Sequence, residues 1–289
     1  MTETPNYSFC RLCPRQCCVD RTASEYGFCG GGDLAVVAKT MLHHWEEPVL
    51  AGEGGSGAIF FGGCTLGCRY CQNRAISASP EGTAMDAPAL RRVMEELIAR
   101  GADNIDLVTP THFLPTVAQA LEEKLPVPVV YNCGGYERAQ MLQCLEGKVD
   151  IYLPDLKYGE NALGAQLSGA GNYVQYATSA IKEMYRQTGP VQLQGDRMVR
   201  GVLIRHLVLP GQVENSLKVL DWIGENFSPG QVLVSLMSQY TPMPGMKPPL
   251  DRRVTEAEYD AVLSWMLLND LQGFTQEITA ADEGFIPDF

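Results

Sequence analysis

Residues 62–73 read GGCTLGCRYCQN and place Cys64, Cys68 and Cys71 in the spacing C-x3-C-x2-C, directly after the apolar run Ala58-Ile59-Phe60-Phe61. Three thiolates on one short loop suit a cubane iron–sulfur cluster, whereas a structural zinc ion takes four protein ligands. The fourth iron of such a cluster stays open to another ligand. The glycines of this stretch allow the backbone to turn tightly around a bulky group, because glycine reaches positive φ without strain.

This spacing, with an aromatic residue before the third cysteine and a strand before the loop, resembles the signature of radical S-adenosylmethionine (SAM) enzymes. The group around pyruvate formate-lyase activating enzyme is the most similar. The resemblance implies a [4Fe–4S] cluster on Cys64, Cys68 and Cys71, with the amino and carboxylate groups of SAM on the unique iron. It also implies an oxidoreductase in which one electron, from a partner such as flavodoxin or ferredoxin, cleaves SAM to methionine and a 5′-deoxyadenosyl radical. The alternative is a zinc or redox loop.

The composition favours one large α/β domain with a small appendage. The chain has 289 residues, and 45% of them are hydrophobic, which is enough to bury a substantial core. Its net charge of −12 argues against binding nucleic acid through backbone phosphates. We find no apolar run of about 18 residues and no signal peptide, so we expect a soluble cytoplasmic protein with no membrane partner. Ten cysteines in such a chain indicate ligands rather than disulfides.

A second cysteine-rich stretch, CRLCPRQCC, occupies residues 10–18, and another cysteine follows in a glycine-rich turn. The C-x2-C spacing lets two sulfur atoms point at one metal. The predicted ligands are Cys10, Cys13, Cys17 and Cys29, with Cys18 left over. Zinc, a second iron–sulfur cluster and uncoordinated thiols all remain open. Some chains of the same radical SAM group carry a similar CxLCPRxC segment, which the activating enzyme itself lacks. We expect residues 1–54 to form this metal-binding segment and a linker, and residues 55–289 to form the barrel and a C-terminal tail.

From residue 58 onward, short apolar strands alternate with amphipathic helices. Strands are expected at 58–62, 105–108, 127–131, 149–153, 201–208 and 232–236, and helices at 87–100, 114–124, 137–145, 172–187, 213–227 and 256–269. Such alternation predicts parallel strands joined by right-handed crossovers. Six units predict an α/β fold, a partial (β/α)6 TIM-like barrel, which the resemblance also implies.

In barrels of this kind the chemistry lies on the loops that follow the strands. The candidate SAM contacts on these loops are Asn73, Thr109, Asn132, Asp155, Lys157, Arg205 and Gln239. Asp155 and Lys157 share one face of a strand end, where the alternative to SAM or cation binding is a simple salt bridge at the rim. Arg205 lies in an apolar strand, where an unpaired charge is costly, so it needs an anion.

Other rim residues allow two interpretations. His112 is either a proton donor near the cluster or a structural histidine. Cys133 is expected to be a small buried thiol, with a redox role as the alternative. Two stretches depart from the activating enzyme: TPTH at 109–112 replaces a glycine-rich segment, and SQY at 238–240 replaces a histidine contact.

The expected function is hydrogen abstraction by a SAM-derived radical, by likeness in activating a glycyl-radical enzyme. The alternative within the class is a radical SAM enzyme acting on a small metabolite or a peptide. From another class, the chain is an iron–sulfur electron carrier or a zinc-stabilised binding protein that does not cleave SAM. The rim polar cluster speaks against both, because neither needs a nucleoside-sized pocket. The apolar C-terminal stretch EGFIPDF is expected to pack on the barrel.

Overall fold

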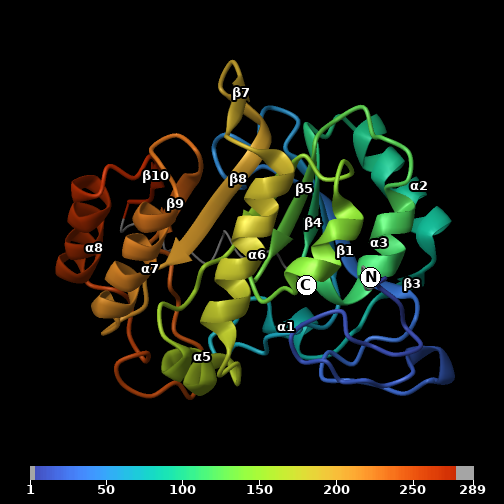
Figure 1. Ribbon diagram of the computed structural model, residues 1–289, viewed down its shortest axis with the longest axis horizontal. Helices are drawn as coiled ribbons and strands as arrows, with labels where there is room; N and C mark the ends of the chain where they lie inside the picture. The colour runs from blue at the N-terminus through green and yellow to red at the C-terminus, as the bar shows by residue number, and fades with distance from the viewer. Residues whose placement is uncertain (1–3, 278–289) are drawn as a thin grey trace.

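The computed structural model of the protein describes residues 4–277 and contains one strongly curved sheet (Figure 1). The strand order is β10-β9-β8-β6-β5-β4-β2-β1-β3, and β7 pairs with β8 outside this path. The strands are β1 (Ala35–His43), β2 (Ser56–Phe61), β3 (Thr83–Met85), β4 (Asn104–Val108), β5 (Val129–Cys133), β6 (Ile151–Pro154), β7 (Gln192–Gln194), β8 (Arg197–Leu207), β9 (Leu233–Met237) and β10 (Gly273–Thr275).

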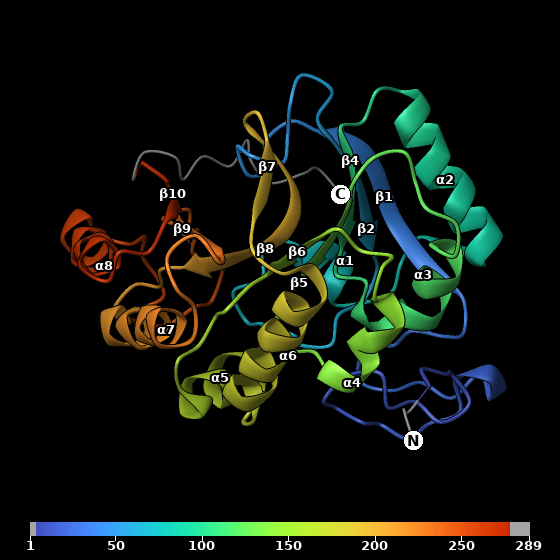
Figure 2. The ribbon, with the colours of Figure 1, turned by 45° about the horizontal axis from the view of Figure 1, so that its top comes forward.

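Helices follow the strands and cover the outer side of the sheet, as Figure 2 shows for α2, α3, α6 and α7. The helices are α1 (Arg74–Ser77), α2 (Ala87–Ala99), α3 (Leu114–Ala120), α4 (Ala139–Leu142), α5 (Asn161–Ser168), α6 (Tyr173–Thr188), α7 (Val213–Asn226) and α8 (Glu256–Leu268), with 3-10 turns η1 (Arg21–Ala23), η2 (Thr111–Phe113) and η3 (Gln143–Leu145). In the described part of the chain, none of these helices is long and apolar enough to cross a membrane.

The six expected strands are confirmed as β2, β4, β5, β6, β8 and β9, and neighbours along this series pair in parallel. Most residues of these strands are buried, which suits strands that are covered on both faces. The predicted partial (β/α)6 barrel is therefore confirmed. All of these strands end at one edge, and the loops that follow them form the mouth of the barrel.

Several elements differ from the expectation. Strand β1 pairs antiparallel with β2, although it lies N-terminal to residue 55, where we expected the barrel to begin. It is mostly half-buried, so its apolar pattern is weak. Helix α3 ends at Ala120, four residues before the expected end, and prolines 126 and 128 favour extended backbone in the segment that follows. The expected helix at 137–145 divides into α4 and η3. The C-terminal EGFIPDF stretch lies outside the described residues.

The N-terminal segment of residues 4–34 packs beside the mouth, next to α1 in Figure 1. It contains no strand and only the short turn η1. Arg21 lies buried within it and donates hydrogen bonds to the carbonyl oxygens of His112 (2.6 Å) and Gly32 (2.8 Å). A buried guanidinium needs such acceptors, because desolvating it without them is costly. Arg21 thus holds this segment to the loop that follows β4.

The loops after β4 and β5 are joined by a buried carboxyl group, Glu137. It accepts hydrogen bonds from the hydroxyl groups of Thr111 and Tyr131. Burial raises the pKa of Glu137 to about 8. In the unfolded chain a glutamate titrates near pH ~4.3. Between these two values the folded protein holds a proton that the unfolded chain has lost, so the free energy of unfolding falls as pH rises.

We expect the variant Glu137→Gln to lose less stability than the wild type between about pH 5 and about pH 8, by up to about 4 kcal/mol. Urea denaturation at a series of pH values measures this difference. Glu122→Gln, which alters an exposed carboxylate, is the control and should keep the wild-type profile. Parallel profiles for the wild type and Glu137→Gln would contradict the burial of an uncharged Glu137.

Candidate active site

Strand β2 delivers the three motif cysteines to the mouth of the barrel. Cys68 is buried, Cys64 and Cys71 are partly buried, and all three are free thiols. Each sulfur atom accepts a hydrogen bond, from the Leu66 amide to Cys64 (3.4 Å), from Ser168 to Cys68 (3.0 Å) and from Ser77 to Cys71 (3.4 Å). Hydrogen bonds to sulfur tune iron–sulfur clusters, so the surroundings of these thiols suit such a group. We call residues 62–73 the cluster loop.

The three thiols lie near one another. Burial raises the pKa of Cys64 to about 12, and the neighbouring Cys68 and Cys71 add to this rise. Burial also raises the pKa of Cys68, and the neighbouring Lys157 ammonium partly lowers it again. The thiols of Cys64 and Cys68 therefore carry protons at neutral pH, and a metal that binds them must displace those protons.

Tyr70, within the cluster loop, begins a chain of hydroxyl groups that leads back to a motif cysteine. Its hydroxyl lies 2.9 Å from that of Tyr158, which lies 2.6 Å from the Ser168 hydroxyl, the donor to Cys68. Tyr70 is buried, as expected of a residue that shields one side of the loop from water.

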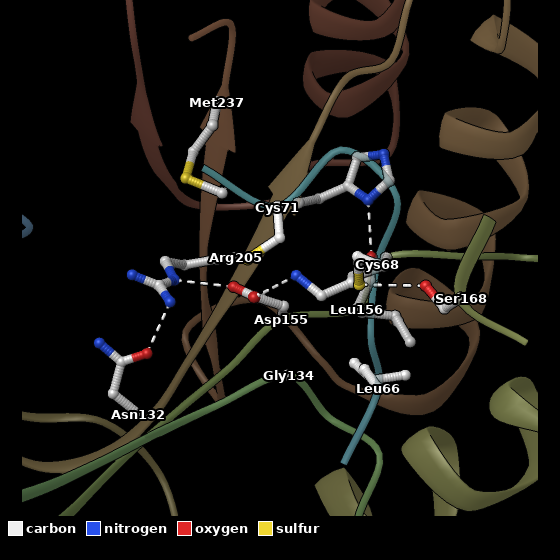
Figure 3. Close-up of polar contacts among 12 residues, drawn as sticks. Leu66, Cys68, Cys71, Asn132, Gly134, Asp155, Leu156, Ser168, Arg205 and Met237 are labelled. Carbon is white, nitrogen blue, oxygen red and sulfur yellow. Dashed lines mark hydrogen bonds and ion pairs between the residues drawn. The ribbon is translucent and has the colours of Figure 1, made fainter. Parts of the chain in front are cut away.

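An ion-pair layer lies next to the cluster loop (Figure 3). Asp155, just after β6, accepts from Lys157 at 2.5 Å and from Arg205 Nε at 2.9 Å. Arg205 Nη2 also donates to Asn132 Oδ1 at 2.6 Å. Burial acts to raise the pKa of Asp155, but Arg205 and Lys157 hold it below its ordinary value. The structure thus brings four of the predicted contacts together, from β5, β6 and β8.

Three acidic residues near this layer escaped the sequence analysis. Glu46, from the loop between β1 and β2, lies 3.5 Å from Arg205 Nη1. Asp106 in β4 is fully buried, accepts from Asn132 at 3.3 Å, and has its pKa raised by burial and by Glu46. Burial and Glu46 also raise the pKa of Glu47 to about 7.

The sequence carried a signal for only one of these three acids, Asp106. Asp106 is a charge in an apolar strand, the same signal that singled out Arg205. We interpreted Glu46 and Glu47 only as part of a linker, because nothing local shows that their loop folds back beneath the barrel.

The remaining predicted contacts lie around the mouth in different settings. Asn73 precedes α1, and its side chain makes no capping hydrogen bond. Thr109 follows β4 with φ of +62°, a conformation that is strained for a β-branched residue and that collects at functional sites. Gln239 is half-buried, and its carbonyl oxygen accepts a hydrogen bond from Gln72 in the cluster loop at 3.0 Å.

His112 and Cys133 are both buried. His112 Nε2 lies 2.8 Å from the carbonyl oxygen of Gly62, and burial lowers the pKa of its imidazole to about 4. The neutral ring therefore fixes the start of the cluster loop, which is the structural interpretation of this histidine. Cys133 is a buried thiol, and burial raises its pKa well above the ordinary value.

The residues fit a [4Fe–4S] cluster by their chemistry. Three free thiols face one another on one glycine-rich loop, and each accepts a hydrogen bond. The backbone approaches closely there, since a Cβ atom on Gly134 would lie 2.6 Å from the Leu66 side chain. Within residues 4–277 no group of three or more His, Cys, Asp or Glu side chains has the arrangement of a metal-ion site. A cluster differs from one ion in this respect, because each thiolate binds a different iron.

Known proteins resemble this chain in sequence. A family model described as a 4Fe-4S single cluster domain matches residues 50–145, which include the cluster loop. The protein named "Uncharacterized protein MJ0674" from Methanocaldococcus jannaschii is 31% identical over 266 residues, covering 88% of this chain and 73% of that protein.

Solved structures resemble it in fold. A radical SAM methyltransferase from Sphaerobacter thermophilus matches with a TM-score of 0.52 at 11% identity, over 77% of this chain and 67% of that one. SuiB from Streptococcus suis, bound to SAM, matches with a TM-score of 0.51 at 13% identity, over 77% of this chain and 50% of SuiB. This chain thus spans about half the length of SuiB.

The match to the cluster-domain model agrees with the predicted [4Fe–4S] cluster. At these low identities the solved structures speak for the fold alone. The model of a 4Fe–4S single cluster domain matches the part of the chain that includes the loop after β2. The chain belongs to the same family as the MJ0674 protein, and it has the partial-barrel fold of radical SAM enzymes.

Proposed function

We propose that the protein is a radical SAM enzyme that abstracts a hydrogen atom from its substrate. The cluster is held by Cys64, Cys68 and Cys71, and SAM binds beside it. The observation that carries this proposal is the position of the three thiols next to the layer of Asp155, Lys157 and Arg205, at the mouth where parallel barrels hold their active sites. When bound and reduced, the cluster supplies one electron for the cleavage of SAM.

The residues of the chain bind and orient the cofactor. Lys157 is close enough to Cys68 to oppose the rise in its pKa, and it offers a cation to a carboxylate at the cluster. Arg205 and Asn132 present polar groups to the same side of the mouth. Asp155 holds both cations in place, so the site is organised before a ligand arrives, which lowers the cost of binding.

Thr109 and Gln239 complete the SAM site in this proposal. Thr109 takes the position of the glycine-rich segment of the activating enzyme, and its backbone has the strained φ of +62° at the loop that follows β4. Gln239 replaces the histidine contact, and its loop is tied to the cluster loop through Gln72. Asn73 follows the third cysteine of the motif, with its side chain free of a capping role.

The substrate is proposed to be either a glycine of a partner enzyme, as in the activating enzymes, or a peptide or small metabolite. The structure of SuiB bound to its precursor peptide SuiA, similar in fold with a TM-score of 0.51 at 12% identity over 76% of this chain and 48% of SuiB, favours a peptide-sized guest. A flavodoxin or ferredoxin is the proposed reductant. The rival function, an electron carrier without SAM cleavage, gives no reason for the ion-pair layer beside the cluster loop.

Anaerobic reconstitution followed by dithionite and SAM should release 5′-deoxyadenosine, measured by chromatography. The variant Cys71→Ala should lower this release by at least about a hundredfold, because two thiolates hold the cluster poorly. Cys144→Ala, which changes a half-buried cysteine in η3, is the matched control and should keep wild-type activity. A reconstituted wild type that holds its cluster but forms no 5′-deoxyadenosine would support the electron carrier instead.

The variant Asp155→Asn should weaken SAM binding by about tenfold or more. Lys157 and Arg205 then lose the negative charge that fixes the positions of both. Equilibrium dialysis with labelled SAM on the reconstituted protein measures the affinity. Glu122→Gln removes an exposed carboxylate paired with Lys148 at 2.8 Å, and it should leave SAM affinity unchanged. An unchanged affinity in Asp155→Asn would exclude a role of this layer in SAM binding.

The variant Thr109→Gly should raise the free energy of unfolding by about 1 kcal/mol, because strain of about 1–3 kcal/mol outweighs the entropy of an added glycine. The same variant should bind SAM more weakly. Thr109→Asn serves as the comparison, because asparagine tolerates positive φ and keeps a polar side chain. Denaturant titration and dialysis give the two quantities. A glycine variant that is less stable and binds SAM normally would refute both parts.

A further inference from the structure

Arg15, from the N-terminal segment, holds four backbone carbonyl groups at the mouth. Its guanidinium donates to the carbonyl oxygens of Thr65 and Leu66 in the cluster loop, both at 3.0 Å. It also donates to those of Ser168 (2.9 Å) and Gly169 (2.6 Å) at the end of α5. Two of these carbonyl groups lie between the first two cysteines of the motif, and Ser168 is the donor to Cys68. Arg15 therefore fixes the cluster loop against α5.

Phe28 adds a second contact between the same segment and the cluster loop. The Arg15 guanidinium lies over the Phe28 ring at 3.9 Å, a cation–π contact. A Cβ atom on Gly67 in the cluster loop would lie 3.2 Å from that ring, so the ring covers this glycine closely. Nearby, a Cβ atom on Gly63 would lie 2.5 Å from the carbonyl oxygen of Cys29. The cluster loop and the turn at Cys29 therefore pack with their backbones in direct contact.

Both contacts originate between cysteines of the N-terminal stretch: Arg15 lies between Cys13 and Cys17, and Phe28 directly precedes Cys29. Regular secondary structure adds little order to this segment, because residues 4–34 contain no strand and only one short 3-10 turn, and the buried Arg21 ties it to the loop after β4 rather than to the cluster loop. A side chain that holds four carbonyl groups needs a rigid backbone, since the entropy of ordering a loop opposes every contact that it makes. Part of that rigidity must therefore come from contacts among residues 10–29 themselves.

The four cysteines themselves are arranged as neighbours. Backbone hydrogen bonds from Cys10 to Val19 and from Cys18 to Cys10, both 2.9 Å, close residues 10–19 into a loop. The Phe28 amide donates to Cys17 Sγ at 3.4 Å, which brings the Cys29 turn beside this loop. Burial raises the pKa of Cys13, and the thiols of Cys29, Cys10 and Cys17 raise it further. Cys18, by contrast, is exposed and donates to the carbonyl oxygen of Gln16 at 3.2 Å.

We propose that Cys10, Cys13, Cys17 and Cys29 bind a second metal centre through their thiolates, and that this centre fixes the segment that carries Arg15 and Phe28 against the cluster loop. The centre is an iron–sulfur cluster, because no group of three or more cysteines within residues 4–277 has the arrangement of a single-ion site, whereas each thiolate of a cluster binds a different iron. Ligands of this kind close around the metal as it binds, so metal binding and local folding are coupled. The role of Arg15 as a positioning residue rests on the proposed function, whereas the metal centre does not.

Metal analysis of full-length variants tests the centre. The variant Cys64→Ser/Cys68→Ser/Cys71→Ser lacks the motif thiols, and after anaerobic reconstitution it should still hold about four irons with sulfide. Adding Cys10→Ser and Cys13→Ser should remove that metal. Cys18→Ser added instead is the matched control and should keep it. Circular dichroism establishes that each variant is folded. Equal metal contents with and without Cys10 and Cys13 would overturn the proposal, and so would a metal-free triple variant.

The rate at which an iron chelator strips the cluster loop tests the positioning. Arg15→Lys keeps a charge but loses the fork that reaches four carbonyl groups, so the loop should release iron several-fold faster. Cys10→Ser/Cys13→Ser should show the same acceleration. Arg11→Lys is the matched control, because Arg11 is exposed and stacks on Phe9 at 4.6 Å. Iron release as slow as in the wild type from Arg15→Lys would refute the positioning. A protein that holds both centres but forms no 5′-deoxyadenosine would refute the proposed function and leave this inference standing.

Discussion

The parallel pairing of β2, β4, β5, β6, β8 and β9 is the constraint on which the rest of the structure depends. Parallel strands end at one edge, so loops that are far apart in the chain meet there. Asn132, Asp155 and Arg205 come from three different strands and make direct hydrogen bonds only because the registers of those strands align. The cluster loop after β2 enters the same mouth, and the chemistry of the site follows from this convergence.

Charge buried near the mouth has to be balanced within a small volume. Arg205 contacts Asp155 and Glu46, while Asp155 also holds Lys157. Breaking such a pair is costly, because the remaining charge has lost its water. Burial and Glu46 raise the pKa of Asp106, which favours its uncharged form and reduces the negative charge beside Arg205. An organised layer of this kind has little left to rearrange when a charged ligand binds beside it.

Sequence patterns predicted the parts of the fold and site that depend on local order. The alternation of apolar strands and amphipathic helices gave six strands and most of the helix boundaries, because burial on a sheet imposes those periods. Arg205 was found because a charge in an apolar strand must have a partner. Strand β1 was not predicted, since its residues are mostly half-buried and show no clear apolar pattern. Glu46 and Glu47 were missed because their loop reaches the barrel from its other end.

By itself, the amino-acid sequence determined the three-cysteine motif, the six strand–helix units and the set of polar residues at strand ends. These features are local, since spacing, periodicity and glycine content act over a few residues. The tertiary structure alone decided which of these residues meet: Asp155 with Arg205 and Lys157, and Arg15 with the cluster loop. Such contacts join residues that are up to about 150 positions apart, as between Arg15 and Ser168, and strand register and loop packing set their geometry.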